Sequence, residues 1–460
     1  MTRTVFALVV PILAGGAAAV AEDPPAKTGP LRPCPDNPRY FADGSGKAVF
    51  LTGAHTWNNL VDMGPTDPPA RFDYAAYLDY LGRYGHNFIR MWTWESTKWN
   101  PKEAGRNASL NVFPHPWSRP GPGEARDGKP KFDLTKYNPE YFDRLRARVS
   151  EAGRRGIYAS IMLFEGWGMQ FAPGAWESHP LHPDNNVNGL NGDANGDGKG
   201  LEIHEMAVPA VTAVQEAYVR KVVDTVNDLD NVLYEISNEN HPPSTEWQYH
   251  MIRFLHEYER TKPKQHPVGM TFQYKGGSNR TLFEGPADWI SPNPEGGYRD
   301  QPPPADGRKV VLSDTDHLWG IGGSVAWVWK SFLRGHNVLF MDPYDGTVLG
   351  KRFEPKWEPI LRSMGAALRY ARRMDLAKAR PQGELSSTTY CLAEPGKVYL
   401  AYLPGTDEIA LDLSAAPGRF SLEGYDPATG ETRSGDPVEG GKKLALKAPF
   451  PGAVLCLQKD

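Results

Sequence analysis

The stretch Asn231-Val-Leu-Tyr-Glu-Ile-Ser-Asn-Glu-Asn240 is rich in β-branched, aliphatic and aromatic side chains and ends abruptly in Asn238-Glu239. Such a run is typical of a buried parallel strand. Further along, Lys309-Val-Val-Leu-Ser-Asp-Thr-Asp316 repeats the pattern, as a short apolar run that ends in carboxylates. Because active sites of (β/α)8 barrels lie where the strands end, both endings are candidate sites of chemistry. Paired carboxylates are what glycoside hydrolysis requires.

Short β-rich runs alternate with helical stretches from residue 37 to about residue 376, which predicts an α/β domain built as a (β/α)8 TIM barrel. The predicted strands are Val49–Thr56, Phe88–Trp94, Ile157–Phe164, Val232–Asn238, Pro267–Tyr274, Trp289–Pro292, Val310–Ser313 and Asn337–Met341. The predicted helices are Tyr74–Tyr84, Tyr141–Arg155, Val214–Leu229, Trp247–Arg260 and Trp357–Met374. Long insertions follow the second and third strands, at 95–140 and 165–210, where barrel loops carry function.

Residues 380–460 differ in character, because short strands alternate there with Gly- and Pro-containing turns. This pattern predicts a small antiparallel β-sandwich. Cys391 and Cys456 both fall on predicted strands of this segment and could form a disulfide, which would leave Cys34 unpaired. Whether they pair depends on a geometry that spacing alone does not define.

The first 21 residues have the features of a secretory signal peptide: Met1-Thr-Arg3 is weakly basic, Val5–Leu13 is apolar, and Ala19-Val-Ala21 offers a cleavage site. A solvated leader is predicted at 22–36. We therefore expect a secreted or periplasmic protein without a membrane span, since the apolar part is too short for a confident membrane anchor. The net charge of −4 argues against nucleic acid as a partner.

Glu239 is the predicted general acid/base, with Asn238 beside it as a ligand of a substrate hydroxyl. The alternative is that Asn238 caps the following helix and Glu239 is a solvated loop residue. Arg90 and Glu235 are charges on inward-facing strands, which are costly to bury singly. They could pair with each other, or Arg90 could hold a nucleophilic carboxylate ionised.

Other polar and aromatic residues at predicted strand ends are candidates for binding sugar. Tryptophan offers a flat apolar face with a polar edge, which suits the C–H faces of a sugar ring. For any single tryptophan the alternative is ordinary core packing, but several gather at strand ends. The candidate substrate-binding residues are His55, Trp57, Trp92, Trp94, Glu165, Trp167, His317 and Trp319.

The ordered set of Arg90 on the second strand, Asn238-Glu239 after the fourth and a carboxylate ending the seventh resembles the signature of clan A glycoside hydrolases. More narrowly, Gly53-Ala-His-Thr-Trp57, Phe88-Ile-Arg-Met-Trp-Thr-Trp-Glu95 and Val232-Leu-Tyr-Glu-Ile-Ser-Asn-Glu239 resemble the apiosidase-like catalytic domains. The C-terminal segment resembles the collagen-binding-type domain often attached to them. The resemblance implies hydrolysis of O-glycosidic bonds in a polysaccharide or oligosaccharide by two carboxylates, with no cofactor required.

One departure from that resemblance concerns the nucleophile. Clan A enzymes normally carry Glu at the end of strand seven, where this chain has Ser313-Asp314-Thr-Asp316. Strand register favours Asp314 as the nucleophile. Asp316 is the competitor, or with His317 it could instead line the substrate-binding subsite. Retention needs about 5–5.5 Å between the carboxyl groups and inversion about 6.5–9.5 Å, so the shorter Asp leaves the predicted retention open. It also leaves open a non-catalytic exported protein that binds glycan or matrix on a degenerate glycosidase barrel.

A further motif lies in the second insertion, where Asp193, Asn195 and Asp197 alternate before Gly198. This spacing matches the first half of a calcium loop, with oxygen ligands at positions one, three and five and glycine at six. The twelfth position, normally Glu, is His204, although Glu202 and Glu205 are close. The alternatives are a structural calcium site and a turn-rich surface loop.

Overall fold

The computed structural model describes residues 29–100 and 109–460. The predicted signal peptide (1–21) and the first part of the predicted leader (22–28) lie outside the described residues, as does 101–108 of the first insertion. Within the described residues, no helix is both long and apolar enough to cross a bilayer.

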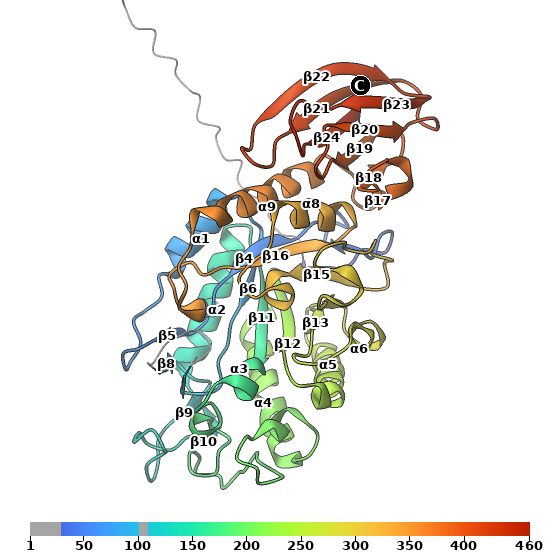
Figure 1. Cartoon of the computed structure of the whole chain (residues 1–460). Helices are drawn as coiled ribbons and strands as arrows, with labels where there is room; N and C mark the ends of the chain where they lie inside the picture. The colour runs from blue at the N-terminus through green and yellow to red at the C-terminus, as the bar shows by residue number, and fades with distance from the viewer. Residues whose placement is uncertain (1–28, 101–108) are drawn as a thin grey trace, which may run out of the picture.

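Eight parallel strands form a closed barrel (Figure 1). They are β4 (Thr52–His55), β6 (Phe88–Met91), β11 (Tyr158–Glu165), β12 (Val232–Asn238), β13 (Val268–Thr271), β14 (Trp289–Ser291), β15 (Val310–Asp314) and β16 (Asn337–Met341). The ring closes because β16 pairs with β4 and β4 pairs with β6. Each strand falls on one of the eight predicted runs, so the predicted TIM barrel is confirmed.

Both faces of the barrel strands are buried, which explains why their sequences are almost continuously apolar. All residues of β11 and β12 are buried, and the two strands end together, with Glu165 opposite Asn238. A Cβ added at Gly53 would lie 1.8 Å from the backbone oxygen of Phe88, so β4 and β6 can approach this closely only with glycine there.

Helices cover the outside of the barrel and follow most of the strands. They are α1 (Tyr74–Arg83), α2 (Pro139–Arg154), α4 (Pro209–Val226), α5 (Thr245–Glu259), α6 (Asn279–Glu284), α8 (Val325–Leu333) and α9 (Glu358–Ala371). The predicted helices match five of these to within a few residues at either end. Capping side chains define several of the starts, since Asp73, Asn138 and Ser324 accept hydrogen bonds from the first turns of α1, α2 and α8.

An N-terminal sheet closes the end of the barrel opposite the strand termini that carry Glu165 and Asn238. It consists of β1 (Arg32–Pro33), β2 (Phe41–Ala42) and β3 (Ala48–Val49). Leu31 and Phe41 pack there against residues at the start of the barrel strands, such as Phe88 and Leu233. Leu31 and Cys34 are 1% exposed, so the predicted solvated leader is wrong at these two positions: they belong to the core.

The two insertions form small elements of their own. In the first, β7 (Lys98–Trp99) and β8 (Leu110–Phe113) join β5 (Asp62–Gly64) in one sheet, and β9 (Trp117–Ser118) pairs with β10 (Asp133–Tyr137). The second contains α3 (Trp167–Phe171) and the short 3-10 helices η2 (Trp176–Ser178) and η3 (Leu201–His204).

The C-terminal segment forms two antiparallel sheets around a separate apolar cluster, which confirms the predicted β-sandwich. The larger sheet contains β17 (Arg380–Pro381), β18 (Cys391–Glu394), β19 (Val398–Tyr402), β24 (Val454–Lys459), β21 (Arg419–Tyr425) and β22 (Thr432–Glu439). The smaller sheet contains β20 (Glu408–Asp412) and β23 (Lys443–Lys447).

The disulfide considered between Cys391 and Cys456 is not formed, and all three cysteines are buried and free. The strand order explains this, because β19 lies between β18 and β24. In addition, Cys391 packs in the core of the sandwich, whereas Cys456 packs in the core shared with the barrel. A separation of two strands on opposite faces is too large for a disulfide.

The large sheet of the sandwich packs on α8 and α9, on the outside of the barrel (Figure 1). The contact is aromatic: the Tyr425 ring lies 5.5 Å from Trp329 on α8 and 6.0 Å from Tyr370 on α9, between ring centroids. Arg373 adds an ion pair of 2.7 Å to Glu423 on β21. One face of the large sheet is therefore part of the barrel core, while the other face packs in the separate core of the sandwich.

We expect Tyr425→Ala to lower the free energy of unfolding by about 3–5 kcal/mol, the range for truncating a buried aromatic side chain. Tyr425 is 0% exposed and packs its sheet against the barrel core. Calorimetry of the variant should show a lower melting temperature in a transition that involves both domains. Unchanged melting would contradict a shared core.

Candidate active site

A pocket of about 460 Å³ lies at the C-terminal ends of the barrel strands. Glu239, directly after β12, and Asp316, on the short helix α7 (Thr315–Leu318) that follows β15, both line it. Glu239 has a backbone φ of 43°, in the left-handed region that side chains other than glycine avoid. A residue held there against its local preference indicates that the surrounding structure fixes its position.

The environment of Glu239 favours the protonated carboxylic acid. The residue is 7% exposed, and among the described residues no Arg or Lys forms an ion pair with it. Burial raises the pKa of Glu239 well above its usual value, and Asp316 raises it further. Arg90 opposes this rise only in part.

Asp316 shares the pocket but has a cation beside it. Its carboxylate accepts a hydrogen bond of 2.8 Å from Arg90 Nη1. Burial raises the pKa of Asp316 above its usual value, while Arg90 works to lower it. Because Arg90 bonds Asp316 and not Glu239, a proton shared by this acidic pair resides on Glu239 and Asp316 carries the charge.

Asp314, the last residue of β15, is 0% exposed and does not line the pocket. His55 Nε2 lies 2.9 and 3.0 Å from its two oxygens, and the backbone N–H of Asp316 donates to Oδ1. Although burial opposes it, His55 and Arg90 hold the pKa of Asp314 below its usual range. Asp314 is thus an ionised anchor whose oxygens are already engaged.

His55 is oriented by Trp92. The indole N–H of Trp92 donates to His55 Nδ1 at 2.8 Å, so the ring hydrogen is on Nε2 and points to Asp314. His55 is 1% exposed and is absent from the pocket lining. His55, which was predicted to bind substrate, therefore lies behind the residues that line the pocket.

Arg90 connects the site. Its guanidinium donates to both oxygens of Glu235, at 2.7 and 2.5 Å, to Asn238 Oδ1 at 2.5 Å and to Asp316. Both roles considered for Arg90, pairing with Glu235 and contacting a nucleophile candidate, occur together. The fork geometry of arginine makes such simultaneous contacts feasible.

Asn238 lines the pocket beside Glu239, whereas Glu165, predicted to bind substrate, is buried behind it and does not line the pocket. The Asn238 side chain is held by Arg90 and by a hydrogen bond with Glu165, and it lines the pocket. Glu165 also accepts backbone hydrogen bonds from Trp167 and Gly168, and burial raises its pKa to about 8. The alternative of a helix-capping Asn238 beside a solvated Glu239 is wrong, because both residues are buried and the cap of α5 is Ser244.

Aromatic side chains form the walls of the pocket. Four predicted tryptophans line it: Trp57, Trp92, Trp167 and Trp319. Trp167 and Trp319 are partly exposed, whereas Trp57 and Trp92 are buried. Trp94 does not line the pocket, since it stacks on Trp99 with 4.6 Å between ring centroids and supports Trp57 from behind.

His317 lines the pocket as predicted, and Ser291 and Asn238 contact its two ring nitrogens. The lining residues that sequence reasoning missed include Phe272 and Tyr274, just beyond β13, and Arg299, in the loop after β14. The first two could have been found as aromatic residues at the end of the fifth predicted strand. Arg299 stacks over Trp319, 5.4 Å from the ring centroid, and no local pattern indicates it.

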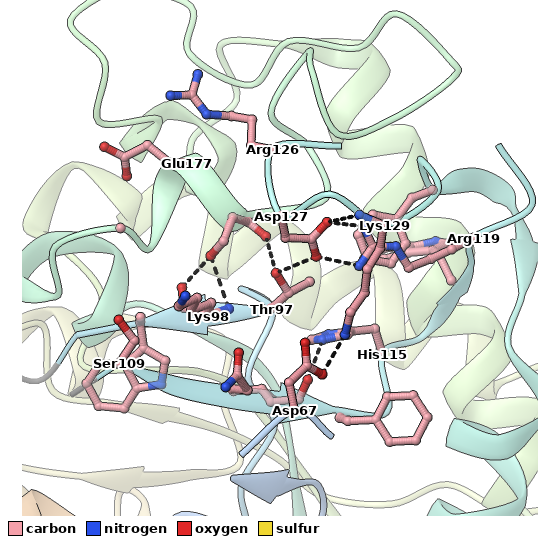
Figure 2. Close-up of a pocket in the computed structure, with 18 of the residues that line it drawn as sticks. Asp67, Thr97, Lys98, Ser109, His115, Arg119, Arg126, Asp127, Lys129 and Glu177 are labelled. Atoms are coloured by element: carbon pink, nitrogen blue, oxygen red, sulfur yellow. Dashed lines mark hydrogen bonds and ion pairs between the residues drawn. The ribbon is translucent and has the colours of Figure 1, made fainter. Parts of the chain in front are cut away.

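A larger cavity of about 790 Å³ lies among the strands of the first insertion (Figure 2). Its charged groups largely pair with one another, as Arg119 does with both oxygens of Asp127 at 2.6 Å and Lys129 with Asp67 at 2.6 Å. It contains none of the carboxylates at barrel strand ends. The 460 Å³ pocket is the better candidate for chemistry.

Among the described residues, no group of three or more His, Cys, Asp or Glu side chains gathers closely enough to hold a metal ion. Asp193, Asn195 and Asp197 lie in the second insertion and do not line the pocket.

Comparisons with known proteins support the fold. Residues 106–275, less than half of the chain, match a family described as a domain of unknown function, DUF6298. No curated protein matches significantly. Among solved structures, a glycoside hydrolase family 5 protein from Bacteroides vulgatus is similar over 94% of both chains, with a TM-score of 0.61 and 12% identity. A second, described as a glycoside hydrolase, has a TM-score of 0.59 and 12% identity over 94% of this chain and 97% of its own. The chain thus has the fold of these glycoside hydrolases.

Proposed function

We propose that the protein is a glycoside hydrolase that cleaves O-glycosidic bonds of a polysaccharide or oligosaccharide, with Glu239 as acid/base and Asp316 as nucleophile. The observation that carries the proposal is the difference between the two carboxyl groups that line the pocket: Arg90 bonds Asp316 but does not bond Glu239. Such a pair supplies the proton donor and the ionised carboxylate that the reaction needs. The signal-like N-terminus supports a secreted or periplasmic location.

Each group has a defined step in this mechanism. Asp316 attacks the anomeric carbon while Glu239 gives its proton to the leaving oxygen, so that the glycosidic bond breaks and a glycosyl ester forms. Glu239, now a carboxylate, then removes a proton from water, and the resulting attack on the anomeric carbon releases Asp316. Arg90 keeps Asp316 ionised between turnovers.

Retention is the stereochemical outcome that we infer. It follows from the resemblance to clan A glycoside hydrolases, and the two carboxyl groups that would serve it line one pocket. Asp316 lies two residues beyond the end of β15, on α7, and lines the pocket. NMR of the first-formed product anomer should show the configuration of the substrate, and the opposite anomer would contradict retention.

Release of reducing sugar from a broad panel of polysaccharides and aryl glycosides tests the function. The wild type should release sugar, and a matched Glu239→Gln/Asp316→Asn preparation should not. Saturable glycan binding without turnover by the wild type would instead favour the non-catalytic binding protein. The shorter Asp in place of Glu is the feature that favours that alternative.

The rate of hydrolysis should show a bell-shaped dependence on pH. Activity requires Asp316 deprotonated, so it rises as pH passes up through the raised pKa of Asp316. Activity also requires Glu239 protonated, so it falls as pH passes up through the pKa of Glu239, which lies well above its ordinary value. Measured kcat/KM should therefore be highest between the two values; a rate independent of pH would contradict the pair.

Trp319 should act mainly in binding. It is partly exposed on the pocket wall, with its ring backed by Trp327 at 5.5 Å between centroids. We expect Trp319→Ala to raise KM about tenfold or more while kcat changes less, since a stacking platform contributes about 1–2 kcal/mol in ground and transition states alike. Trp94→Phe, behind the wall, is the matched control and should leave KM nearly unchanged.

A further inference from the structure

The loop Asp193–Gly198, between η2 and η3, is folded around its own acidic side chains. The Asp193 carboxylate accepts hydrogen bonds from the backbone N–H groups of Gly196, Asp197 and Gly198, at 3.0, 3.2 and 2.9 Å. Asn195 Oδ1 accepts another from Asp197 at 2.8 Å. Each of these oxygens has two lone pairs. Asp193 Oδ2 and Asn195 Oδ1 each accept one hydrogen bond, so each has one lone pair available for a cation.

A separate observation comes from Glu202, on η3. This side chain is 9% exposed and points to the loop, since its Oε1 accepts a hydrogen bond from Asn195 Nδ2. Its other oxygen, Oε2, is buried and has no hydrogen-bond partner among the described residues. A buried carboxylate oxygen without a partner is costly, and its place beside acidic residues indicates a missing positive charge.

The charges of the loop agree with that reading, because Asp193, Asp197 and Glu202 are all acidic. Lys199 pairs with Asp197 at 2.8 Å, but it is an exposed partner and such pairs are weak. The net charge of these groups remains negative.

We propose that this loop binds a calcium ion through the side-chain oxygens of Asp193, Asn195, Asp197 and Glu202, with the backbone oxygen of Lys199 completing the set. Calcium prefers six to eight oxygen ligands in a flexible arrangement, and positions one, three, five and seven supply four of them. His204, at position twelve, is unsuitable because it is buried against Glu95 at 3.3 Å. Glu202 takes its place.

The ligands come together only when the ion binds. The three carboxylates are not gathered as a cluster in the structure described here, as expected for like charges without a counterion. The amide of Asn195, which now contacts Glu202, would turn its oxygen to the ion. Calcium thus closes η3 onto the loop.

The site lies where it can stabilise the acid/base loop. His204 at the end of η3 contacts Glu95, and the next residue, Glu205, bonds His241 at 2.8 Å, two residues after Glu239. Calcium bound at the loop would therefore stabilise the contact between Glu205 and His241, and with it the segment that contains Glu239. The calcium proposal itself does not depend on hydrolytic activity.

Terbium luminescence on the full chain tests the site directly. After removal of metal with a chelator, Tb³⁺ should give a saturable signal through excitation of tryptophan, because the Trp176 ring packs against Gly200 beside the loop. Ca²⁺ should displace Tb³⁺ with a dissociation constant of about 10⁻⁴ M or tighter, and should raise the melting temperature. Mg²⁺ at the same concentration should do neither.

Variants identify the ligands. Glu202→Gln and Asp193→Asn should each weaken Ca²⁺ binding about tenfold or more while far-UV circular dichroism is unchanged. Asp184→Asn, an exposed carboxylate of the same insertion outside the loop, is the control and should bind Ca²⁺ as the wild type does. Wild-type affinity in Glu202→Gln, equal stabilisation by Mg²⁺, or no saturable binding up to about 10⁻² M Ca²⁺ would overturn the proposal.

Discussion

Asp316→Ala should lose activity by about 10⁴-fold or more in kcat, the scale expected when a nucleophile is removed. The reason is positional: Asp316 is the carboxylate that both lines the pocket and contacts Arg90 at 2.8 Å. Sodium azide should restore part of the activity towards an aryl glycoside, because the small anion can occupy the vacated space. The product should be a glycosyl azide of inverted configuration.

Asp314→Ala is the informative comparison. Asp314 holds His55 and the first turn of α7, so its loss should lower activity by disturbing the position of Asp316. Azide should not restore it, because the space that Asp314 leaves is buried and does not open to the pocket. If azide rescued Asp314→Ala but not Asp316→Ala, the nucleophile would be Asp314 and the assignment of Asp316 would be wrong.

Glu239→Gln should have the second-largest effect. General acid catalysis contributes about 10²–10⁴-fold, so glycosides with poor leaving groups should lose activity on that scale. Aryl glycosides with acidic leaving groups need less protonation and should be cleaved with a smaller loss in the first step. Measurement of kcat/KM against leaving-group pKa should therefore show a steeper dependence in the variant than in the wild type.

The pH profile provides the control for this assignment. Glu239→Gln should lose the alkaline limb, because the group whose raised pKa produces it is gone. Glu165→Gln should keep that limb, although burial also raises the pKa of Glu165, since its oxygens are engaged by Trp167 and Gly168. Loss of the limb in Glu165→Gln alone would contradict Glu239 as the acid.

The barrel could be predicted because each strand is recognisable from its own short stretch of sequence. Runs such as Val232–Asn238 and Asn337–Met341 are apolar on both faces, and their spacing by helices leaves few other folds. The end of the leader could not be predicted in this way. Leu31 and Cys34 lie among polar and proline residues, and only contact with the barrel, far away in sequence, buries them.

The residues of the candidate site could be predicted, but not which of them line the pocket and which lie behind it. Glu239 and Asn238 follow from a strand end, whereas the choice between Asp314 and Asp316 depends on how α7 begins. His55 ends β4 and Trp94 follows β6, yet both side chains lie behind the pocket wall. Layering of side chains around a barrel is a property of tertiary packing, which sequence position alone does not encode.

The central claim is that Asp316 forms a covalent glycosyl intermediate, with Glu239 as the acid of the first step and the base of the second. Trapping of this intermediate tests the claim. In Glu239→Ala, an aryl glycoside with an acidic leaving group should still glycosylate Asp316, while the second step lacks its base and slows. Intact-protein mass spectrometry should show one added glycosyl group, and peptide mapping should place it on Asp316. An adduct on Asp314 or Glu165 would contradict the account, as would full turnover by Glu239→Ala without an adduct.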